Sequence, residues 1–283
     1  MPAMYKAIYP QYPHFKCIAD KCPIGCCFFR IDIFKEEEQL FETKAVWRDI
    51  DGKGNSIRKY LEKDCKGYFF KSHPNGKCIF CNDRKLCDIQ LRYGENPDNL
   101  PLLCRTYPRI ITALDGRTEY ALEPCCPVAA ASVKDWETGE ILIEGEKTGS
   151  TDKPTMLRDS ALRIISNSRT SLRDCLIELS GLYGCGLEIP QFEIDGEREE
   201  FLRKETALMI WTYMLQYDGM PEIENLMEFI ISFILLYIDT LGSRKYDSWW
   251  DMCVDYSRSL VDYSTYRGFI VEHEERYGDV LKY

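Results

Sequence analysis

The chain has 283 residues, of which 14 are cysteine and only 3 are histidine, and its formal net charge is −10. A hydrophobic content of 45% with 29% charged residues is typical of a globular protein with a sizeable core, and it excludes a disordered or low-complexity chain. The acidic balance argues against a nucleic-acid-binding protein, because such proteins need a basic surface to displace counterions from phosphate.

Charge and cysteine are both distributed unevenly along the chain. Residues 1–150 hold 22 basic and 22 acidic side chains, so the whole net charge lies in residues 151–283. Eleven of the fourteen cysteines lie in the first 126 residues. We therefore expect a cysteine-rich domain at residues 1–133 and a helical domain at residues 155–283, joined by a linker at residues 134–154.

The first part of the chain predicts little regular structure. Residues 1–30 are rich in proline, cysteine and aromatic side chains, so we expect them to be irregular. Apolar positions in residues 31–47 predict a short strand that enters a helix. Residues 48–76 are polar and glycine-rich and indicate a loop with one helical piece at residues 57–61. Residues 140–143 are compatible with a short strand within the linker.

A β-hairpin is predicted around Asp115-Gly116. Two β-prone runs, Ile110–Leu114 and Arg117–Leu122, flank this dipeptide, which is the strongest short-range hairpin signal. If Leu114 faces Arg117, the numbers of paired residues sum to 231. We then expect Cys104 to lie at the same end of the hairpin as Cys125 and Cys126.

From residue 155 onward, apolar residues recur at spacings of 3, 4 and 7, which is the pattern of amphipathic helices. Helix-length patterns cover residues 155–179, 201–217, 221–241, 248–262 and 266–277. The longest apolar run is far shorter than the ~20 residues of a membrane span, so we expect no transmembrane segment. The predicted fold class is mainly α: an irregular cysteine-rich N-terminal domain with a small β-hairpin, then an α-helical C-terminal domain.

The glycines at 181, 184 and 186 form the only candidate for a cofactor-binding glycine loop. They follow a helix pattern rather than a strand, so we interpret them as a helix terminator. A Rossmann-type methyltransferase, whose glycine loop follows a strand, is therefore not expected.

The cysteines form two groups with short spacings, Cys17-x4-Cys22-x3-Cys26-Cys27 and Cys78-x2-Cys81-x5-Cys87. Residues 1–16 contain three prolines and no apolar run, so we expect no secretory signal and a cytoplasmic location. Thiols stay reduced there, which makes a disulfide framework improbable. Clustered thiols in loops bounded by glycine and proline instead indicate a metal site. Cys175, Cys185 and Cys253 stand apart and fit core packing better.

Spacing alone leaves the metal open between zinc and iron–sulfur. The few histidines favour all-thiolate coordination. A four-cysteine zinc site typically contains two CxxC pairs, whereas this chain has only the pair at Cys78 and Cys81. Iron–sulfur clusters also take four thiolates and tolerate irregular spacings. The C-x3-C-x2-C spacing of radical S-adenosylmethionine enzymes is absent, because Phe29 stands where the third thiol would be.

Several motifs together resemble the flagellin lysine-N-methylase family over roughly residues 10–130. The first is Phe15-x-Cys17-x4-Cys22-x3-Cys26-Cys27-x4-Asp32, and the second is Gly76-x-Cys78-x-Phe80-x6-Cys87-Asp88-Ile89-Gln90. They are followed by Cys104-Arg105-x-Tyr107-Pro108-Arg109 and by Cys126-Pro127, with a weaker likeness at Tyr256-Ser257-Arg258. Cys81 and Cys125 stand outside the family pattern.

The resemblance implies an S-adenosylmethionine-dependent protein-lysine N-methyltransferase that modifies surface lysines of flagellin and carries a 4Fe-4S cluster. Eight thiols occupy motif positions and are the candidate ligands: Cys17, Cys22, Cys26, Cys27, Cys78, Cys87, Cys104 and Cys126. One cubane needs only four, so the choice among them stays open, as does a second metal site. The alternative is a non-catalytic zinc- or iron-binding protein that delivers metal or supports a partner.

The remaining functional groups are less defined by sequence. Arg105 and Arg109 flank Cys104 and are candidates for binding an anionic cofactor carboxylate, for balancing cluster charge, or for surface ion pairs. Methylation needs a neutral lysine amine, whose unperturbed pKa is about 10.4, and the sequence assigns no base to it. Polar and radical transfer, the cofactor site and the oligomeric state all stay open.

Overall fold

The computed structural model describes residues 5–28, 30–65, 67–94, 96–114, 116–145, 153–214 and 220–262. The chain forms two compact units. One, here called the cysteine unit, is Cys17–Tyr107, and the other, the sheet–helix unit, combines Met1–Lys16 with Pro108–Tyr283. About 51% of the chain is helical and 14% is strand, which confirms a mainly α protein with small sheets.

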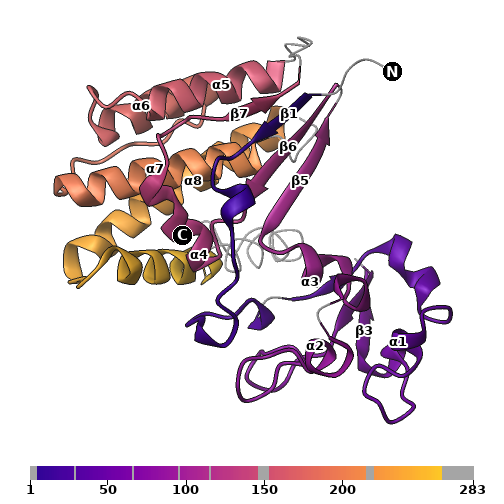
Figure 1. The fold of residues 1–283 in the computed structure, drawn as a ribbon. Coiled ribbons are helices and arrows are strands. Elements are labelled where there is room, and N and C mark those ends of the chain that lie inside the picture. Colours follow the sequence, from indigo (N-terminus) through magenta and orange to yellow (C-terminus); the bar gives the residue numbers. More distant parts are fainter. Residues whose placement is uncertain are drawn as a thin grey trace, which may run out of the picture. The chain divides into compact units, whose positions relative to one another are not determined.

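A four-stranded sheet organises the sheet–helix unit (Figure 1). Its strands are β5 (Arg109–Leu114), β6 (Arg117–Leu122), β1 (Tyr5–Ile8) and β7 (Leu142–Glu144), in that order across the sheet. The predicted hairpin is confirmed, because β5 and β6 pair antiparallel with Leu114 opposite Arg117 and Arg109 opposite Leu122. β1 pairs parallel with β6 and antiparallel with β7.

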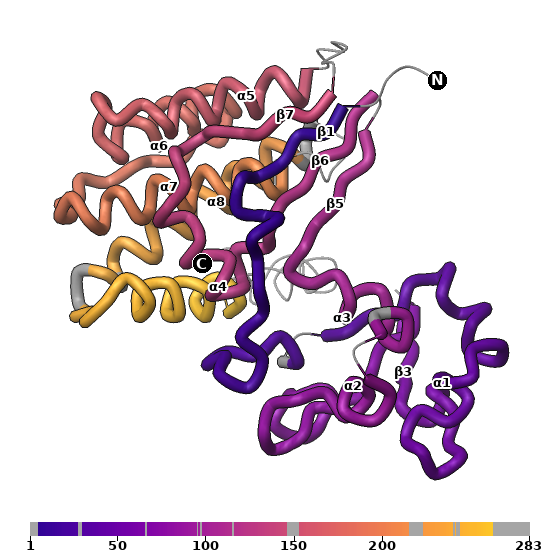
Figure 2. The backbone as a smooth tube through the Cα atoms, in the orientation of Figure 1, coloured from indigo at the N-terminus to yellow at the C-terminus, as the bar shows by residue number. Residues whose placement is uncertain are grey.

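Helices occupy one side of this sheet within the sheet–helix unit, as Figures 1 and 2 show. They are α4 (Pro127–Ser132), α5 (Lys153–Ile165), α6 (Leu172–Tyr183), α7 (Gly196–Tyr213) and α8 (Met220–Ser243), and residues 249–262 are also helical. The predicted helices up to residue 262 are therefore confirmed, and the one predicted at 266–277 lies outside the described residues. Gly184 ends α6 in a left-handed conformation with φ 67°, which confirms the helix terminator.

α7 is the central helix of the unit. Every residue from Phe201 to Thr212 is buried, including charged and polar ones. Its Trp211 Nε1 donates to the Tyr120 carbonyl at 3.2 Å, and its Thr212 Oγ1 donates to the Leu122 carbonyl at 3.1 Å. These bonds join α7 to β6, the strand that lies between β5 and β1 in the sheet.

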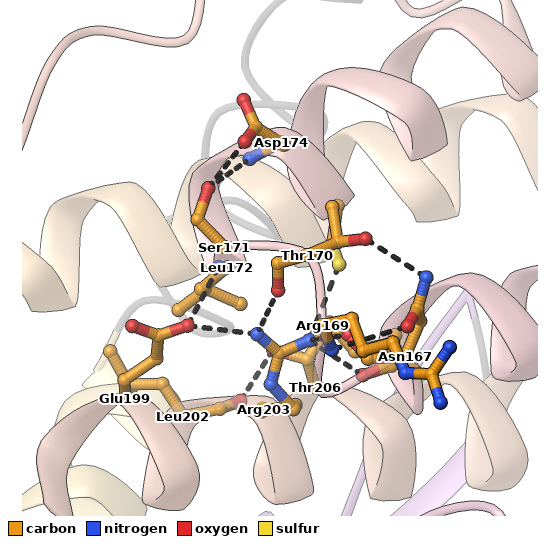
Figure 3. A network of polar contacts seen from close by, with 12 residues as sticks. Asn167, Arg169, Thr170, Ser171, Leu172, Asp174, Glu199, Leu202, Arg203 and Thr206 are labelled. Atoms are coloured by element: carbon orange, nitrogen blue, oxygen red, sulfur yellow. Dashed lines mark hydrogen bonds and ion pairs between the residues drawn. The ribbon is translucent and has the colours of Figure 1, made fainter. Parts of the chain in front are cut away.

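A buried arginine on α7 fixes the junction between α5 and α6 (Figure 3). Arg203 Nη1 donates to the Ile165 carbonyl at 3.0 Å, at the end of α5, and Nη2 donates to the Thr170 carbonyl at 2.8 Å. Glu199 Oε1 accepts from Arg203 Nη2 and also from the Leu172 amide at the start of α6, both at 2.8 Å. One ion pair thereby satisfies a carbonyl at one helix end and an amide at the next.

The cysteine unit contains a three-stranded sheet of order β2-β4-β3, made of β2 (Asp32–Ile33), β4 (Gly67–Phe70) and β3 (Leu61–Asp64). Its α-helices are short: α1 (Ala45–Arg48), α2 (Asp88–Tyr93) and α3 (Leu102–Thr106). Its 3-10 turns are η2 (Ala19–Lys21), η3 (Cys26–Phe28), η4 (Lys35–Leu40), η5 (Ile57–Tyr60) and η6 (Pro97–Asn99). Buried aromatic side chains, among them Phe41, Trp47 and Phe70, form its core together with Cys78 and Cys81.

The structure divides the chain differently from the predicted boundary near residue 150. β7 lies inside the predicted linker at 134–154 and pairs with β1, which lies inside the segment expected to be irregular. The hairpin also belongs with the helices rather than with most of the cysteines. Composition could not reveal this, because strand pairing joins β1 to a strand more than a hundred residues away. Among the helices of the described part, none has both the length and the apolar character to cross a bilayer.

Replacing Arg203 with methionine is expected to destabilise the protein by about 3 kcal/mol, because buried carbonyls and the Glu199 carboxylate lose their donor. Urea unfolding followed by tryptophan fluorescence measures the change. Arg163→Met, an exposed arginine on α5, is the matched control and should cost less than ~0.5 kcal/mol. Equal losses in the two variants would contradict a special role for Arg203.

Stability is also expected to depend on the ionisation of Glu205 on α7. This carboxyl is fully buried, and among the described residues neither of its oxygens has a hydrogen-bond partner. Burial raises the pKa of Glu205 well above its usual value. The folded state therefore holds a proton that the unfolded state releases above pH ~4.5, so stability falls as pH rises through this window.

Glu205→Gln should flatten that pH dependence, because the amide does not ionise. Urea midpoints measured from pH 5 to pH 8 compare the slopes of the two proteins. Parallel slopes in the wild type and in Glu205→Gln would exclude Glu205 as the source.

Candidate metal centre

The thiols of the cysteine unit come together from three chain segments. The first carries Cys26 and Cys27 in η3, the second is the loop from Cys78 to Cys87, and the third is α3, which carries Cys104. The amide of Cys78 donates to the carbonyl of Cys27 at 2.7 Å, which joins the first two segments directly.

The loop from Cys78 to Cys87 is folded by its own polar residues. The side-chain oxygen of Asn82 accepts from the Arg84 amide at 3.0 Å and from the Leu86 amide at 3.1 Å. Lys85 adopts a left-handed conformation with φ 60°, and its ammonium donates to the Cys22 carbonyl at 3.3 Å. The loop turns back on itself so that the backbones of Cys81 and Cys87 pair in an isolated antiparallel β-bridge. A CxxC pair and a third cysteine six residues later are thus placed side by side.

Glu37 positions the third segment. Its side chain is buried, and Oε1 accepts from the Leu102 amide at 2.8 Å, at the first turn of α3. Its other oxygen accepts from the Phe34 amide at 3.3 Å. A carboxylate at the beginning of a helix satisfies an amide that has no partner within the helix. This contact orients the short helix that carries Cys104.

Six thiols interact electrostatically and are called the thiol cluster below: Cys26, Cys27, Cys78, Cys81, Cys87 and Cys104. Burial, together with the charges of neighbouring thiols, raises the pKa of Cys78 to about 11. Burial likewise raises the pKa of Cys104 well above its ordinary value. Because each thiolate opposes the ionisation of the others, the cluster favours protonated sulfur until a cation replaces the protons.

Cys26 is the exception within the thiol cluster. A hydrogen bond from the Cys27 thiol lowers the pKa of Cys26 to about 7, although burial opposes this. The same bond, together with burial, raises the pKa of Cys27. Cys26 is therefore the thiol of this pair that carries the charge near neutral pH, and the thiolate is the form that binds metal.

The donor set suits a soft metal. The thiol cluster offers only sulfur atoms as metal ligands, which favours zinc or an iron–sulfur cluster over hard cations. No disulfide joins any of the described cysteines. Within the described residues, no group of three or more His, Cys, Asp or Glu side chains has the arrangement of a ready-made metal site. A metal site built from the thiol cluster therefore stays a prediction.

The structure gathers five of the eight predicted ligands: Cys26, Cys27, Cys78, Cys87 and Cys104. It adds Cys81, which lies outside the family pattern but belongs to the CxxC pair, a signal visible in the sequence. Cys17 and Cys22 belong to the same unit, where their sulfurs accept from the amides of Ala19 and Gly25, both at 3.4 Å.

Cys126 belongs to the sheet–helix unit, where it is the N-cap residue of α4 and is buried. Cys125, beside it, lies in the same unit, whereas Cys104 lies in the cysteine unit. The expected proximity of Cys104 to this pair stays a prediction.

The two arginines that flank Cys104 have different surroundings. Arg105 Nη1 forms an ion pair with Asp98 Oδ1 at 2.7 Å within the cysteine unit. Arg109 belongs to the sheet–helix unit, where Nη2 donates to the Phe15 carbonyl at 2.9 Å and the guanidinium lies over the Phe15 ring. Of the expected roles, the ion pair accounts for Arg105, and Arg109 bridges two segments of the chain.

The sequence did not predict a hydrogen-bond network around Glu123 in the sheet–helix unit. The Glu123 carboxylate accepts from the Tyr213 hydroxyl and, at 3.3 Å, from the Cys125 amide. Burial raises the pKa of Glu123, and these donors partly offset the rise. Ser257 Oγ donates to the Pro124 carbonyl at 3.1 Å, which connects the Tyr256-Ser257-Arg258 motif to this segment. No local spacing pattern could have indicated these contacts.

Comparisons with known proteins find no match among family models, curated proteins or solved structures. Any functional conclusion therefore depends on the chemistry of this site and on the motifs in the sequence.

We expect the thiol cluster to bind metal, and the amount of metal bound per chain to fall when one of its cysteines is replaced. Cys78→Ser and Cys104→Ser should each lose most of the bound zinc or iron, because serine replaces a soft ligand with a neutral hydroxyl. Cys65→Ser is the matched control, since Cys65 is an exposed thiol of the same unit. Elemental analysis of anaerobically purified protein measures metal per chain. Retention of wild-type metal by both cluster variants would exclude this centre.

Proposed function

We propose that the chain is an S-adenosylmethionine-dependent protein-lysine N-methyltransferase that acts on surface lysines of flagellin and carries a 4Fe-4S cluster. The thiol cluster is the observation that carries the proposal, since five of its six members occupy the cysteine positions of the methylase-like motifs. Packing alone is a poor explanation for six neighbouring thiols, because small apolar side chains would fill the same space without opposing ionisation.

In this proposal, the cysteine unit binds the 4Fe-4S cluster. Four of its thiols are enough for a cubane, and Cys26, Cys78, Cys87 and Cys104 are the set we favour because they come from all three segments. When bound, an iron–sulfur cluster supplies either one-electron chemistry or a covalent brace for the surrounding loops. The short helices and 3-10 turns around it contain little regular hydrogen bonding, so metal binding should also contribute to folding.

Polar methyl transfer from S-adenosylmethionine places specific demands on the protein. The neutral lysine nitrogen donates its electron pair to the methyl carbon, and the carbon–sulfur bond breaks with its electrons left on sulfur, which yields S-adenosylhomocysteine. The proton lost from the lysine ammonium goes to solvent or to a base. Desolvation of the lysine lowers its pKa and increases the fraction of reactive amine. We place the reaction in the cytoplasm, where thiols stay reduced.

Methyl transfer to flagellin is expected only from protein with an intact thiol cluster. Anaerobically purified wild type should absorb broadly near ~400 nm and transfer label from S-adenosylmethionine to flagellin lysines. Cys26→Ser and Cys104→Ser should lose both properties, and Cys65→Ser should keep both. Mass spectrometry of flagellin measures the transfer.

Two outcomes would reject parts of the proposal. Zinc in stoichiometric amount without the ~400 nm band would replace the iron–sulfur cluster by a structural zinc site. Unmodified flagellin after incubation with cluster-loaded protein would favour the non-catalytic alternative, a zinc- or iron-binding protein that delivers metal or supports a partner.

A further inference from the structure

A cavity of about 790 Å³ opens in the sheet–helix unit between the sheet and α5. β1 and β6 contribute Tyr5, Arg117 and Glu119, α5 contributes Arg158, and α7 contributes Trp211. All of these residues belong to one unit, so the cavity does not depend on the cysteine unit. Its volume is in the range of pockets that hold nucleoside-sized molecules.

The floor of the cavity carries more positive than negative charge. Glu119 is paired with both Arg117 and Arg158, and all three side chains are about 5% exposed or less. One carboxylate therefore faces two buried guanidinium groups. Asp159 lies 3.4 Å from Arg158, but its side chain is 43% exposed, so water screens most of its contribution. A buried cation without a full counter-charge is costly unless a ligand supplies the missing anion.

The hydrogen bonds of the floor are also incomplete. Among the described residues, Arg158 Nε has no partner although it is buried. Arg117 Nε and Glu119 Oε1 lie 2.9 Å apart without hydrogen-bond geometry, and both count as unsatisfied. By contrast, Arg117 Nη2 donates to Thr155 Oγ1 at 2.6 Å. Buried polar atoms without partners are rare in folded proteins, and a bound carboxylate could accept from an arginine here.

The rim has the opposite charge. Glu137 and Glu140 are exposed carboxylates that line the cavity, and Asp159 lies with them. Arg163 also lines it and donates to Ser160 Oγ and to the Asp159 carbonyl, so one guanidinium stands against three carboxylates and the rim keeps a negative balance. A plain anion would be repelled by this rim, whereas a molecule with an ammonium group beside its carboxylate would be attracted by both regions.

Apolar side chains complete the cavity. Trp211 lies under Arg158, with 4.2 Å between the guanidinium carbon and the ring centre. Ile143 and Met156 also line the cavity and are 47% and 55% exposed. They offer a surface for an apolar or planar part of a ligand.

We propose that this cavity binds the zwitterionic α-amino-acid end of a small molecule, with the carboxylate at Arg158 and the ammonium at the acidic rim. The identity of the ligand rests on the proposed function: under it, the molecule is S-adenosylmethionine, whose methionine end is such a zwitterion. The apolar wall then faces the remainder of the cofactor.

Isothermal titration with S-adenosylhomocysteine and with 5′-methylthioadenosine, which lacks the amino-acid end, tests the proposal. Wild type should bind the first at least about tenfold more tightly than the second, because only the first has a carboxylate for the arginine. Arg158→Lys and the surface double variant Glu137→Gln/Glu140→Gln should each reduce this preference. Glu144→Gln, an exposed carboxylate on β7 outside the cavity, should leave it unchanged.

Equal affinity for the two compounds would overturn the proposal, as would a preference that survives both sets of variants. Displacement of S-adenosylhomocysteine by millimolar inorganic phosphate would identify a plain anion site and would also overturn it. The rim variant covers the case in which Arg158→Lys does not fold. Flagellin methylation is measured separately. If the Arg158 and rim variants still bind S-adenosylhomocysteine as the wild type does and still methylate flagellin, only the proposal for this cavity is rejected. If the wild type binds S-adenosylhomocysteine in the cavity but does not methylate flagellin, only the proposed function is rejected.

Discussion

The parallel pairing of β1 with β6 is the interaction on which the rest of the structure depends. The Tyr9 amide donates to the Tyr120 carbonyl at 2.9 Å, so the beginning of the chain is fixed beside a strand that appears more than a hundred residues later. Everything between Cys17 and Tyr107 is therefore an insertion in the sheet–helix unit. Within the sheet–helix unit, Arg109 Nη2 donates to the Phe15 carbonyl, which joins the segment that precedes the insertion to the segment that follows it.

This topology explains which features could be predicted from sequence. The hairpin depends on neighbours in the chain, and Asp115-Gly116 was enough to indicate its position and register. The helices from α5 to α8 follow local periodicity in the same way. β1 has only four residues in a region rich in proline and aromatic side chains, and it is a strand only because β6 and β7 lie on either side. Its partners, and hence the division into units, depend on contacts that no local pattern contains.

The thiol cluster shows a similar limit. The CxxC pair and the neighbouring cysteines predict a metal site from their spacing alone, and this stays a prediction. Spacing could not indicate which thiols are neighbours, because the turn around Asn82 and the contact of Glu37 with α3 set the positions of the loop and of the helix that carry them. Neither residue resembles a ligand, and their importance follows from where they hold the backbone. Cys81 was left out of the candidate ligands because it lies outside the family motifs, although its CxxC spacing from Cys78 is itself typical of a metal ligand.

Charge is the property for which composition was least informative. Residues 151–283 are strongly acidic and carry the whole net charge of the chain. Within the described part of the sheet–helix unit, however, the buried charged side chains are mainly basic: Arg117, Arg158, Arg203 and Lys204, against Glu119 and Glu205. Burial raises the pKa of Glu205 well above its usual value, which favours the neutral form of this carboxyl. At Arg203, the Glu199 carboxylate and backbone carbonyls accept hydrogen bonds from the guanidinium. At Arg158 the chain supplies no acceptor for Nε in the described residues, and the proposal of a bound carboxylate rests on this difference together with the cavity beside it.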